Sequence, residues 1–119
     1  MFSASFIFEL GTYDDKFYAL DALIQAAAEA TGGYLGQENW RSSDGKKVNA
    51  IYYWTSLASL KEFSSHPKHL EAKRQYQLWY KSFHIVISEI VKSYGDGRLA
   101  HITPNTRASE PSEPSEPRQ

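Results

Sequence analysis

The residues best suited to chemistry fall on one stretch that is predicted to be helical. His69, Lys73, Tyr76 and Tyr80 are separated by four, three and four positions, which places them along one side of a helix. Pro67 favours a helix start, because proline is well tolerated at the first helical position. A stripe of this composition is too polar to be buried unpaired. The spacing therefore predicts a pocket-lining flank, the alternative being a half-exposed helix whose aromatic residues pack on a sheet.

His69 is the candidate general acid or base of this flank. The ordinary pKa of histidine, about 6.5, suits proton transfer at neutral pH. Lys73 lies one turn away, and it could stabilise negative charge that develops on a substrate, as could Tyr76. We therefore predict His69, Lys73 and Tyr76 as catalytic residues. The alternative is a histidine that hydrogen-bonds a loop or a partner subunit.

Aromatic side chains and one arginine are the candidate substrate-binding groups. Tyr52 and Trp54 lie on a predicted strand, where they could stack against a planar substrate together with Tyr80. Arg74 could hold a carboxylate or a phenolate through two hydrogen bonds. Packing in the core or between subunits explains the aromatic residues as well, and many charged helix residues are simply solvated.

Metal and cofactor motifs are absent from the sequence. His66 and His69, with His84 or Glu62 as a third ligand, could hold zinc or iron. However, the chain has no cysteine and no H-E-x-x-H pattern to support such a site. It also lacks a glycine-rich phosphate loop, a nucleophile elbow and a dinucleotide fingerprint. We expect neither a metal nor a cofactor.

Composition narrows the class of protein further. The chain has 119 residues, of which 41% are hydrophobic, and a formal net charge of -1. This length indicates one domain, and the near-neutral charge gives no electrostatic reason to bind nucleic acid or an anionic membrane. The chain shows no signal peptide and no membrane-spanning segment. Together with the lack of cysteine, this favours a cytoplasmic protein.

The pattern of apolar residues predicts four strands and three helices. Strands are expected at 2–10, 34–41, 46–54 and 83–91, and helices at about 12–31, 57–64 and 67–80. Thr12 and Asp15 resemble a capping box at the first helix start. Asp44 and Gly45 form the clearest hairpin turn. This order predicts an α+β, ferredoxin-like β-α-β-β-α-β fold, with helices on one face of an antiparallel sheet.

Apolar residues on both faces of the sheet predict a homodimer. Phe6, Ile7 and Phe8 are consecutive, and the strand end Ile51–Trp54 is apolar throughout. Helices can cover only one of the two faces in this fold. Stacked sheets lie about 10 Å apart, so a sheet from a second subunit is the natural cover for the other face.

The C-terminal segment differs from the rest of the chain. Residues 103–119 contain three consecutive Ser-Glu-Pro triplets and no aromatic residue. Such a composition buries too little apolar surface to fold. The sequence therefore predicts a domain at 1–102 followed by a disordered tail at 103–119.

Several motifs resemble those of the antibiotic biosynthesis monooxygenase family of dimeric α/β barrels. The motifs are Gly33–Gly36 entering a strand, Ile51–Trp54 ending one, and His66–Ala72 starting a helix, and the resemblance covers about residues 2–95. It implies a homodimer with a ligand pocket between the helices and the sheet of each subunit. Family members include haem-degrading monooxygenases and cofactor-free oxygenases acting on aromatic polyketide intermediates.

Two departures from the family pattern argue against haem degradation. The family's haem degraders use an asparagine on the first strand, where this chain has none, and an axial histidine, where this chain has Lys73. The resemblance therefore implies a small monooxygenase acting on an aromatic or polyketide-like substrate without metal or flavin. The alternative is a non-enzymatic or regulatory dimer that binds a small apolar or aromatic molecule.

Overall fold

The protein is described by a computed structural model that covers residues 1–106. Six side chains of one helix lie outside the description, namely those of His69, Ala72, Lys73, Tyr76, Gln77 and Leu78. The elements in chain order are β1 (Phe2–Leu10), α1 (Asp15–Ala30), β2 (Tyr34–Arg41), β3 (Lys47–Trp54), α2 (Leu57–Ser64), α3 (Pro67–Trp79) and β4 (Tyr80–Glu89). This order confirms the predicted ferredoxin-like α+β fold.

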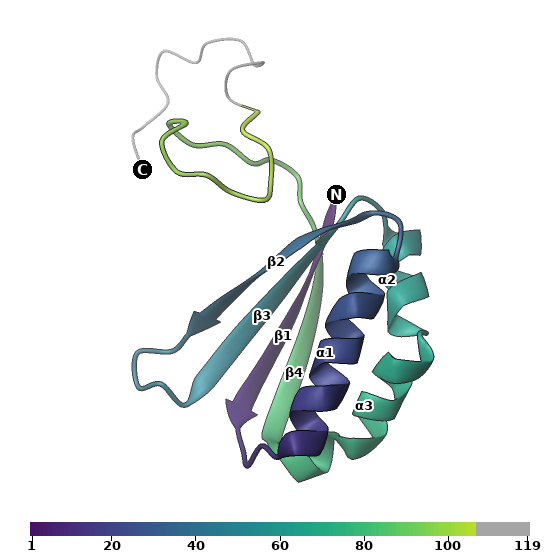
Figure 1. Ribbon diagram of the computed structural model, residues 1–119. Helices are drawn as coiled ribbons and strands as arrows, with labels where there is room; N and C mark the ends of the chain where they lie inside the picture. The colour runs from purple at the N-terminus through teal and green to yellow at the C-terminus, as the bar shows by residue number, and fades with distance from the viewer. Residues whose placement is uncertain (107–119) are drawn as a thin grey trace.

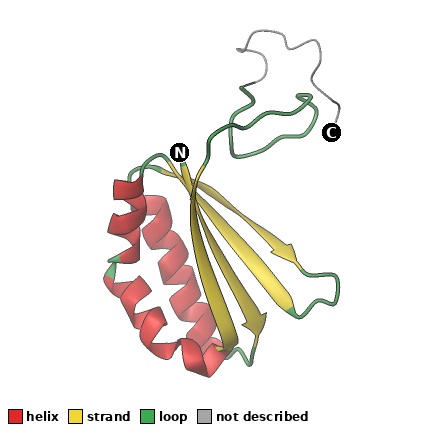
Figure 2. Cartoon of the chain, turned by 180° about the vertical axis from the view of Figure 1, so that it is seen from behind, coloured by secondary structure: helices red, strands yellow, loops and turns green. Residues whose placement is uncertain are grey.

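The strands form one antiparallel sheet in the order β2-β3-β1-β4. The helices lie on one face of this sheet, and the other face carries no helix (Figures 1 and 2). Ala4 of β1 pairs with Tyr52 of β3 and with Ile87 of β4, so these three residues share a face. Ala4 packs against the core beneath the helices, which identifies this face as the helix-facing one.

The hydrophobic core lies between the sheet and the helices near the start of α2. Its buried members are Ala27, Ala28, Trp54, Leu60 and Phe63. Trp54 is fully buried, and its ring centroid lies 5.1 Å from those of both Tyr34 and Phe63. Small alanines on α1 let this helix approach the large indole, since neither residue adds a bulky side chain.

The start of α1 differs from the predicted capping box. The N-cap is Asp14, whose Oδ1 accepts a hydrogen bond from the backbone N–H of Phe17 at 2.8 Å. The helix begins at Asp15, so Thr12 lies too far upstream to cap it. Aspartate caps a helix as well as threonine does, and its charge favours the positive end of the helix dipole.

The junction of α3 and β4 also differs from the prediction. The helix ends at Trp79, and Tyr80 begins the strand opposite Leu10 of β1. The Tyr80 ring packs against those of Phe6 and Phe8, with centroids 5.3 and 4.7 Å apart. These contacts with β1 draw Tyr80 into the sheet, so the predicted helical stripe does not continue to this residue.

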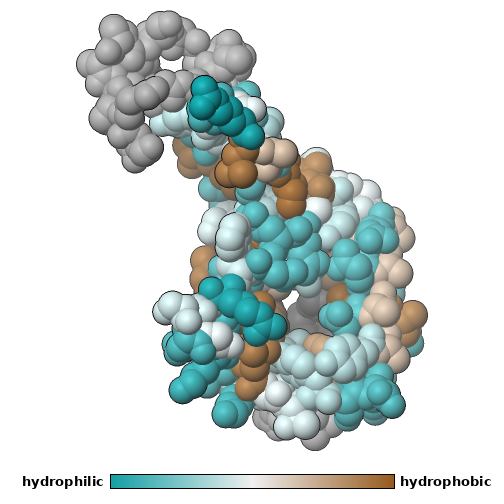
Figure 3. Space-filling view, turned by 60° about the vertical axis from the view of Figure 1, so that its left-hand side comes forward, coloured by the Kyte–Doolittle hydropathy of each residue, from teal (hydrophilic) through white to brown (hydrophobic). Residues whose placement is uncertain are grey.

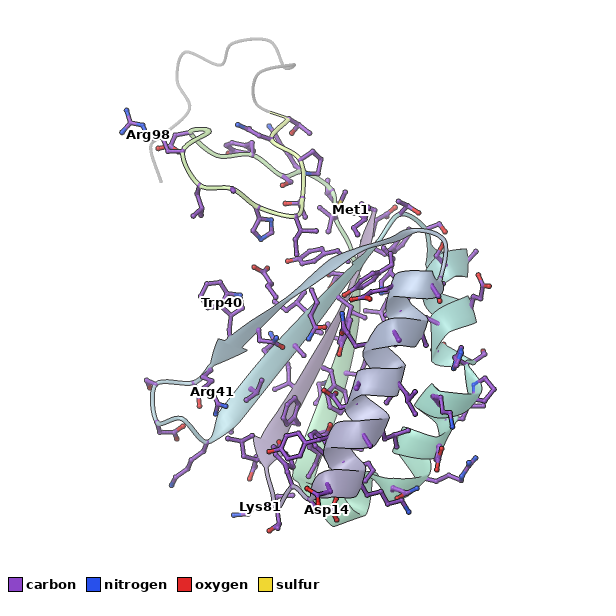
Figure 4. All side chains as sticks on the ribbon, in the orientation of Figure 1. Met1, Asp14, Trp40, Arg41, Lys81 and Arg98 are labelled. Carbon is purple, nitrogen blue, oxygen red and sulfur yellow. The ribbon has the colours of Figure 1, made fainter. Side chains whose placement is uncertain are left out.

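We call the sheet face without helices the open face. Its apolar side chains come from all four strands and are Ile7, Trp40, Ile51, Tyr53 and Val86. Trp40 is 62% exposed and points away from the helical layer (Figure 4). Serines and charged residues alternate with these groups along the strands, so the open face is mixed rather than uniformly apolar.

The segment after β4 folds back onto the open face near β2. His101 Nε2 lies 3.0 Å from Glu38 Oε1, which also accepts a hydrogen bond from the Tyr53 hydroxyl at 2.6 Å. The Tyr53 hydrogen bond, and further contacts with His101, hold the pKa of Glu38 below its ordinary value. Ile102 lies against Gly36, where a β-carbon would stand 3.2 Å from it. Gly36 therefore leaves room for this segment.

The predicted tail begins within this packed segment. The backbone N–H of Thr106 donates a hydrogen bond to the carbonyl of Ser93 at 2.9 Å. Residues 103–106 are thus tied to the chain just after β4. The rest of the predicted tail, 107–119, lies outside the described residues.

Candidate functional site

The three predicted catalytic residues lie on α3, which packs against α1 and β4. His69, Lys73 and Tyr76 are on this helix by their backbone, and their side chains lie outside the description. The helix itself is where the prediction placed it, except at its final residue. The roles of these three residues remain predictions.

Aromatic rings gather where β1, α1 and β4 meet. The Tyr80 ring lies 6.2 Å from that of Tyr13 and 6.1 Å from that of Phe17, measured between centroids. Tyr13 and Phe17 stack on each other at 4.2 Å, and Phe17 also meets Trp79 edge-on at 5.2 Å. Tyr80, a predicted substrate-binding residue, therefore lies at the inner side of the helical layer, with its ring fixed by neighbours on several elements.

A flank of α1 faces the sheet at the level of Tyr52. Phe17 contacts the Tyr80 ring, and eight residues later the Gln25 side chain donates a hydrogen bond to the Tyr34 hydroxyl at 3.3 Å. Asp21 lies one turn from each of these two residues. Residues spaced by four share a helix side, so Asp21 lies on the same flank of α1, where its side chain is exposed.

The electrostatic environment couples Asp21 to the nearby tyrosines. Removal of surrounding water raises the pKa of the Asp21 carboxyl above its ordinary value of 3.8. Burial, followed by the charge of Asp21, raises the pKa of Tyr52 to about 12. Burial is also the main reason that the pKa of Tyr80 is raised, with the charge of Asp21 contributing. At neutral pH these tyrosines keep their hydroxyl protons and act as hydrogen-bond donors.

The side chain of Asp21 is exposed to solvent, yet neighbouring atoms displace part of the water around its carboxylate. Figure 3 shows a hollow between the sheet and the helical layer. We call this site the helix–sheet recess and define it by Asp21, Tyr52 and Tyr80, with Tyr13 and Tyr34 beside them.

Several polar groups of the recess have no hydrogen-bond partner among the described residues. Within residues 1–106, no hydrogen bond joins the Asp21 carboxylate or the hydroxyl of Tyr52 or Tyr80 to a described residue. The Tyr13 hydroxyl is buried and has no partner there either. Unpaired polar groups are costly inside a protein. A bound polar ligand or water would satisfy them, so the recess is suited to a ligand that carries hydroxyl or carbonyl groups.

The remaining predicted residues occupy different surroundings. Tyr52 lines the recess, whereas Trp54 is fully buried in the core, where no ligand reaches it without displacement of other side chains. Arg74 is exposed on α3. His66 Nδ1 accepts a hydrogen bond from the backbone N–H of Lys68 at 3.1 Å, which caps the helix start.

No group of three or more His, Asp or Glu side chains in the described part of the chain could hold a metal ion. In the same residues, no helix combines the length and the apolar character needed to cross a membrane.

Sequence reasoning missed Asp21. A signal was present, because Asp21 falls on the side of α1 that carries Phe17, Ile24 and Gln25. A carboxylate on the core-facing side of an amphipathic helix is unusual and deserves a functional explanation.

The arrangement of elements is that of solved antibiotic biosynthesis monooxygenases, which confirms the resemblance found in the sequence. Residues 7–89 match the sequence profile described as "Monooxygenase af470-like", and the chain belongs to this family.

Solved structures with low sequence identity share the fold. SnoaB from Streptomyces nogalater, described as a cofactor-independent oxygenase, is 13% identical with a TM-score of 0.63, covering 77% of this chain and 94% of SnoaB. Rv0793 from Mycobacterium tuberculosis is 18% identical with a TM-score of 0.60, covering 79% and 98%. A protein described as an antibiotic biosynthesis monooxygenase is 11% identical with a TM-score of 0.61, covering 76% and 99%.

One curated relative shows detectable sequence similarity. The protein YqjZ of Bacillus subtilis, described as uncharacterized, is 27% identical over 71 residues, which are 59% of this chain. The match spans 60% of the length of YqjZ. Because less than two thirds of YqjZ is covered, the activity of the whole protein is proposed below and is not taken from this relative.

Proposed function

We propose that the protein is a small monooxygenase that uses molecular oxygen on an electron-rich aromatic or polyketide-like substrate, without metal or flavin. The observation that carries this proposal is the helix–sheet recess, where a carboxylate influences tyrosine hydroxyls and none of these groups has a hydrogen-bond partner among the described residues. Membership of a monooxygenase family supports it. A cofactor-independent oxygenase with the same fold supports the absence of a cofactor.

The proposed chemistry begins with removal of a proton from a substrate hydroxyl or an activated C–H group. A base takes this proton, and the resulting anion passes one electron to molecular oxygen, which gives a substrate radical and superoxide. These combine to a peroxide, which loses water and leaves a carbonyl group on the substrate. The proposed base is His69, with Lys73 and Tyr76 stabilising the negative charge. Tyr52 and Tyr80 remain protonated and can donate hydrogen bonds to the same anion.

A regulatory dimer that only binds a ligand is the alternative. A closed, purely apolar cavity would favour that reading. The polar groups of the recess, Asp21 among them, favour chemistry on a polar ligand instead.

His69→Ala is the direct test of the proposed base. Purified protein is incubated with a panel of hydroxyanthrones and dihydroxynaphthalenes, and oxygen uptake and absorption spectra are followed. We expect the variant to lose about 100-fold or more of the rate, the usual range for loss of a general base. Its free energy of unfolding should change by only about 1 kcal/mol.

The matched control is His66→Asn, because asparagine can still cap the start of α3. This control should keep the wild-type rate. Unchanged oxygen uptake in His69→Ala would remove His69 from the mechanism. Absence of uptake by the wild type with every compound in the panel would contradict the proposed function for these substrates.

We also propose that the protein is a homodimer joined through the open face. Tyr53 is already buried within one chain, but Ile7, Trp40, Ile51 and Val86 come from the centre and both edges of the sheet, where a monomer would leave them at least partly in water. Ile7→Lys places a charge on the central strand and should yield a monomer, since charge is disfavoured at an interface core. Leu23→Lys, on the exposed side of α1, is the control and should stay dimeric. Analytical ultracentrifugation at micromolar protein concentration measures the oligomeric state of the wild type and both variants. A monomeric wild type would contradict the proposed dimer.

A further inference from the structure

We propose that residues 90–106, which we call the strap, restrain dimer formation: docked on the open face of its own chain, the strap obstructs a second copy, and dimer formation releases it. The identity of the partner rests on the proposed homodimer. The strap lies outside the family match at residues 7–89, so this control on assembly is an addition to the shared fold.

The strap is docked on the open face at one end of β2 and β3. In the sheet register Gly36 lies opposite Tyr53, which is one residue from the helix-facing Tyr52, so Gly36 and Tyr53 belong to the open face. Glu38, two residues after Gly36 on the same strand, shares this face. Figures 1 and 2 show the strap at this end of the sheet, on the side away from the helices.

His101 provides the polar attachment of the strap. Its Nε2 lies 3.0 Å from Glu38 Oε1, and its ring meets that of Tyr53 edge-on with 5.7 Å between centroids. The Tyr53 hydroxyl donates to the same carboxylate oxygen at 2.6 Å. His101 Nδ1 accepts a hydrogen bond from the backbone N–H of Thr103 at 3.1 Å, so the Nε2–H tautomer can donate to Glu38. These contacts are satisfied within one chain, without a second subunit.

Ile102 provides the apolar attachment. A β-carbon built on Gly36 would lie 3.2 Å from Ile102 Cδ1, so the absence of a side chain at Gly36 makes room for the strap. Tyr53 is only 7% exposed although no helix covers its face of the sheet. Its contact with His101 accounts for this burial in part. The strap therefore already occupies the Gly36, Glu38 and Tyr53 end of the open face.

A second copy cannot pack fully on the open face while the strap is docked. Stacked sheets lie about 10 Å apart, and the side chains of the two facing sheets fill this gap. A chain segment that lies on one sheet occupies the same space. In a two-fold dimer the obstruction is present on both subunits, so both straps must leave before the two sheets can pack along their whole length.

Docking of the strap and formation of the dimer are therefore linked equilibria. If the docked strap weakens the dimer, thermodynamic reciprocity requires that dimer formation weakens docking of the strap. A strap that instead formed part of the interface would be held more firmly in the dimer. The two roles predict opposite responses of the strap to protein concentration, and this difference makes the proposal testable.

The first test removes both attachments from the full-length chain by combining His101→Ala with Ile102→Ala. Neither residue belongs to the buried core, so this double variant should fold. Analytical ultracentrifugation over a series of protein concentrations gives the dissociation constant of the dimer. We expect the double variant to dimerise about tenfold more tightly than the wild type or better, because the fraction of free open face counts once for each subunit.

The matched control is Leu99→Ala, a strap residue that is 83% exposed. This control leaves His101 and Ile102 in place and should keep the wild-type dissociation constant. A weaker dimer in Leu99→Ala or in the double variant would overturn the proposal and make the strap part of the interface. An unchanged dissociation constant in the double variant would overturn it as well.

The second test follows the strap itself in the wild type. Hydrogen exchange of its backbone amides is measured by mass spectrometry at protein concentrations below and above the dissociation constant of the dimer. We expect faster exchange in residues 90–106 as the dimer forms, and fast exchange at every concentration in the double variant. Slower or unchanged exchange in the wild-type dimer would overturn the proposal.

The strap and the proposed homodimer fail in different ways. A dimeric wild type with an unchanged dissociation constant in the double variant would contradict the role of the strap alone. A monomeric wild type with a dimeric double variant would support the strap and contradict the wild-type dimer. Monomers throughout would contradict both, while oxygen uptake tests the proposed enzyme activity independently of either.

Discussion

Replacing Gly11 with alanine is expected to destabilise the protein by about 3 kcal/mol, the upper part of the usual range for overpacking. Gly11 follows β1, and a β-carbon there would overlap the backbone carbonyl oxygen of Trp79 and lie 2.8 Å from the carbonyl carbon. A backbone carbonyl cannot move aside by changing rotamer. The clash would instead push β1 away from the junction of α3 and β4.

Urea denaturation at a fixed protein concentration measures this effect. The control is Gly95→Ala, because a β-carbon at Gly95 meets nothing within 4 Å and the residue has no positive φ. This control should unfold close to the wild-type midpoint. Because Tyr80 follows Trp79 directly, Gly11→Ala should also weaken dihydroxynaphthalene binding. Wild-type stability in Gly11→Ala would contradict the close contact between Gly11 and Trp79.

Trp54→Ala is expected to cost about 3–5 kcal/mol, the usual loss when a buried tryptophan is truncated. Trp54 is 0% exposed and touches the rings of Tyr34 and Phe63. Its removal would leave a large cavity between α1, α2 and β3, which rigid strands cannot close. Thermal and urea unfolding measure the loss.

Trp40→Ala is the matched control, since Trp40 is 62% exposed. Exposed substitutions of this kind usually change stability by about 0.5 kcal/mol or less. A larger loss that depends on protein concentration would place Trp40 in the dimer interface. Trp54→Phe should keep most of the stability, and it tests substrate stacking separately. A marked loss of dihydroxynaphthalene affinity in a stable Trp54→Phe protein would support the predicted binding role.

The sequence was sufficient to predict the fold because its patterns are local. Alternation in β1 and the Asp44–Gly45 turn each depend on neighbouring residues, and the structure confirms the elements that they predict. The family motifs pointed to the same architecture. Agreement between local pattern and global fold is what a foldable sequence requires.

The predictions failed where distant contacts decide the outcome. The helical spacing of the sequence predicts that α3 continues to Tyr80. Contacts with Phe6 and Phe8 instead place this residue in β4. These contacts join residues more than 70 positions apart, and no local pattern contains them.

The central position of β1 has a consequence for how the chain is synthesised and folds. This strand pairs with β3 on one side and β4 on the other, and a ribosome makes it before either partner. In this sheet only β2 and β3 pair as chain neighbours through a short turn. Pairing of β1 with β4 must wait until Glu89 has left the ribosome. Non-local pairing of this kind slows folding, so one edge of β1, the edge that pairs with β4, stays unpaired until synthesis of the domain is almost complete.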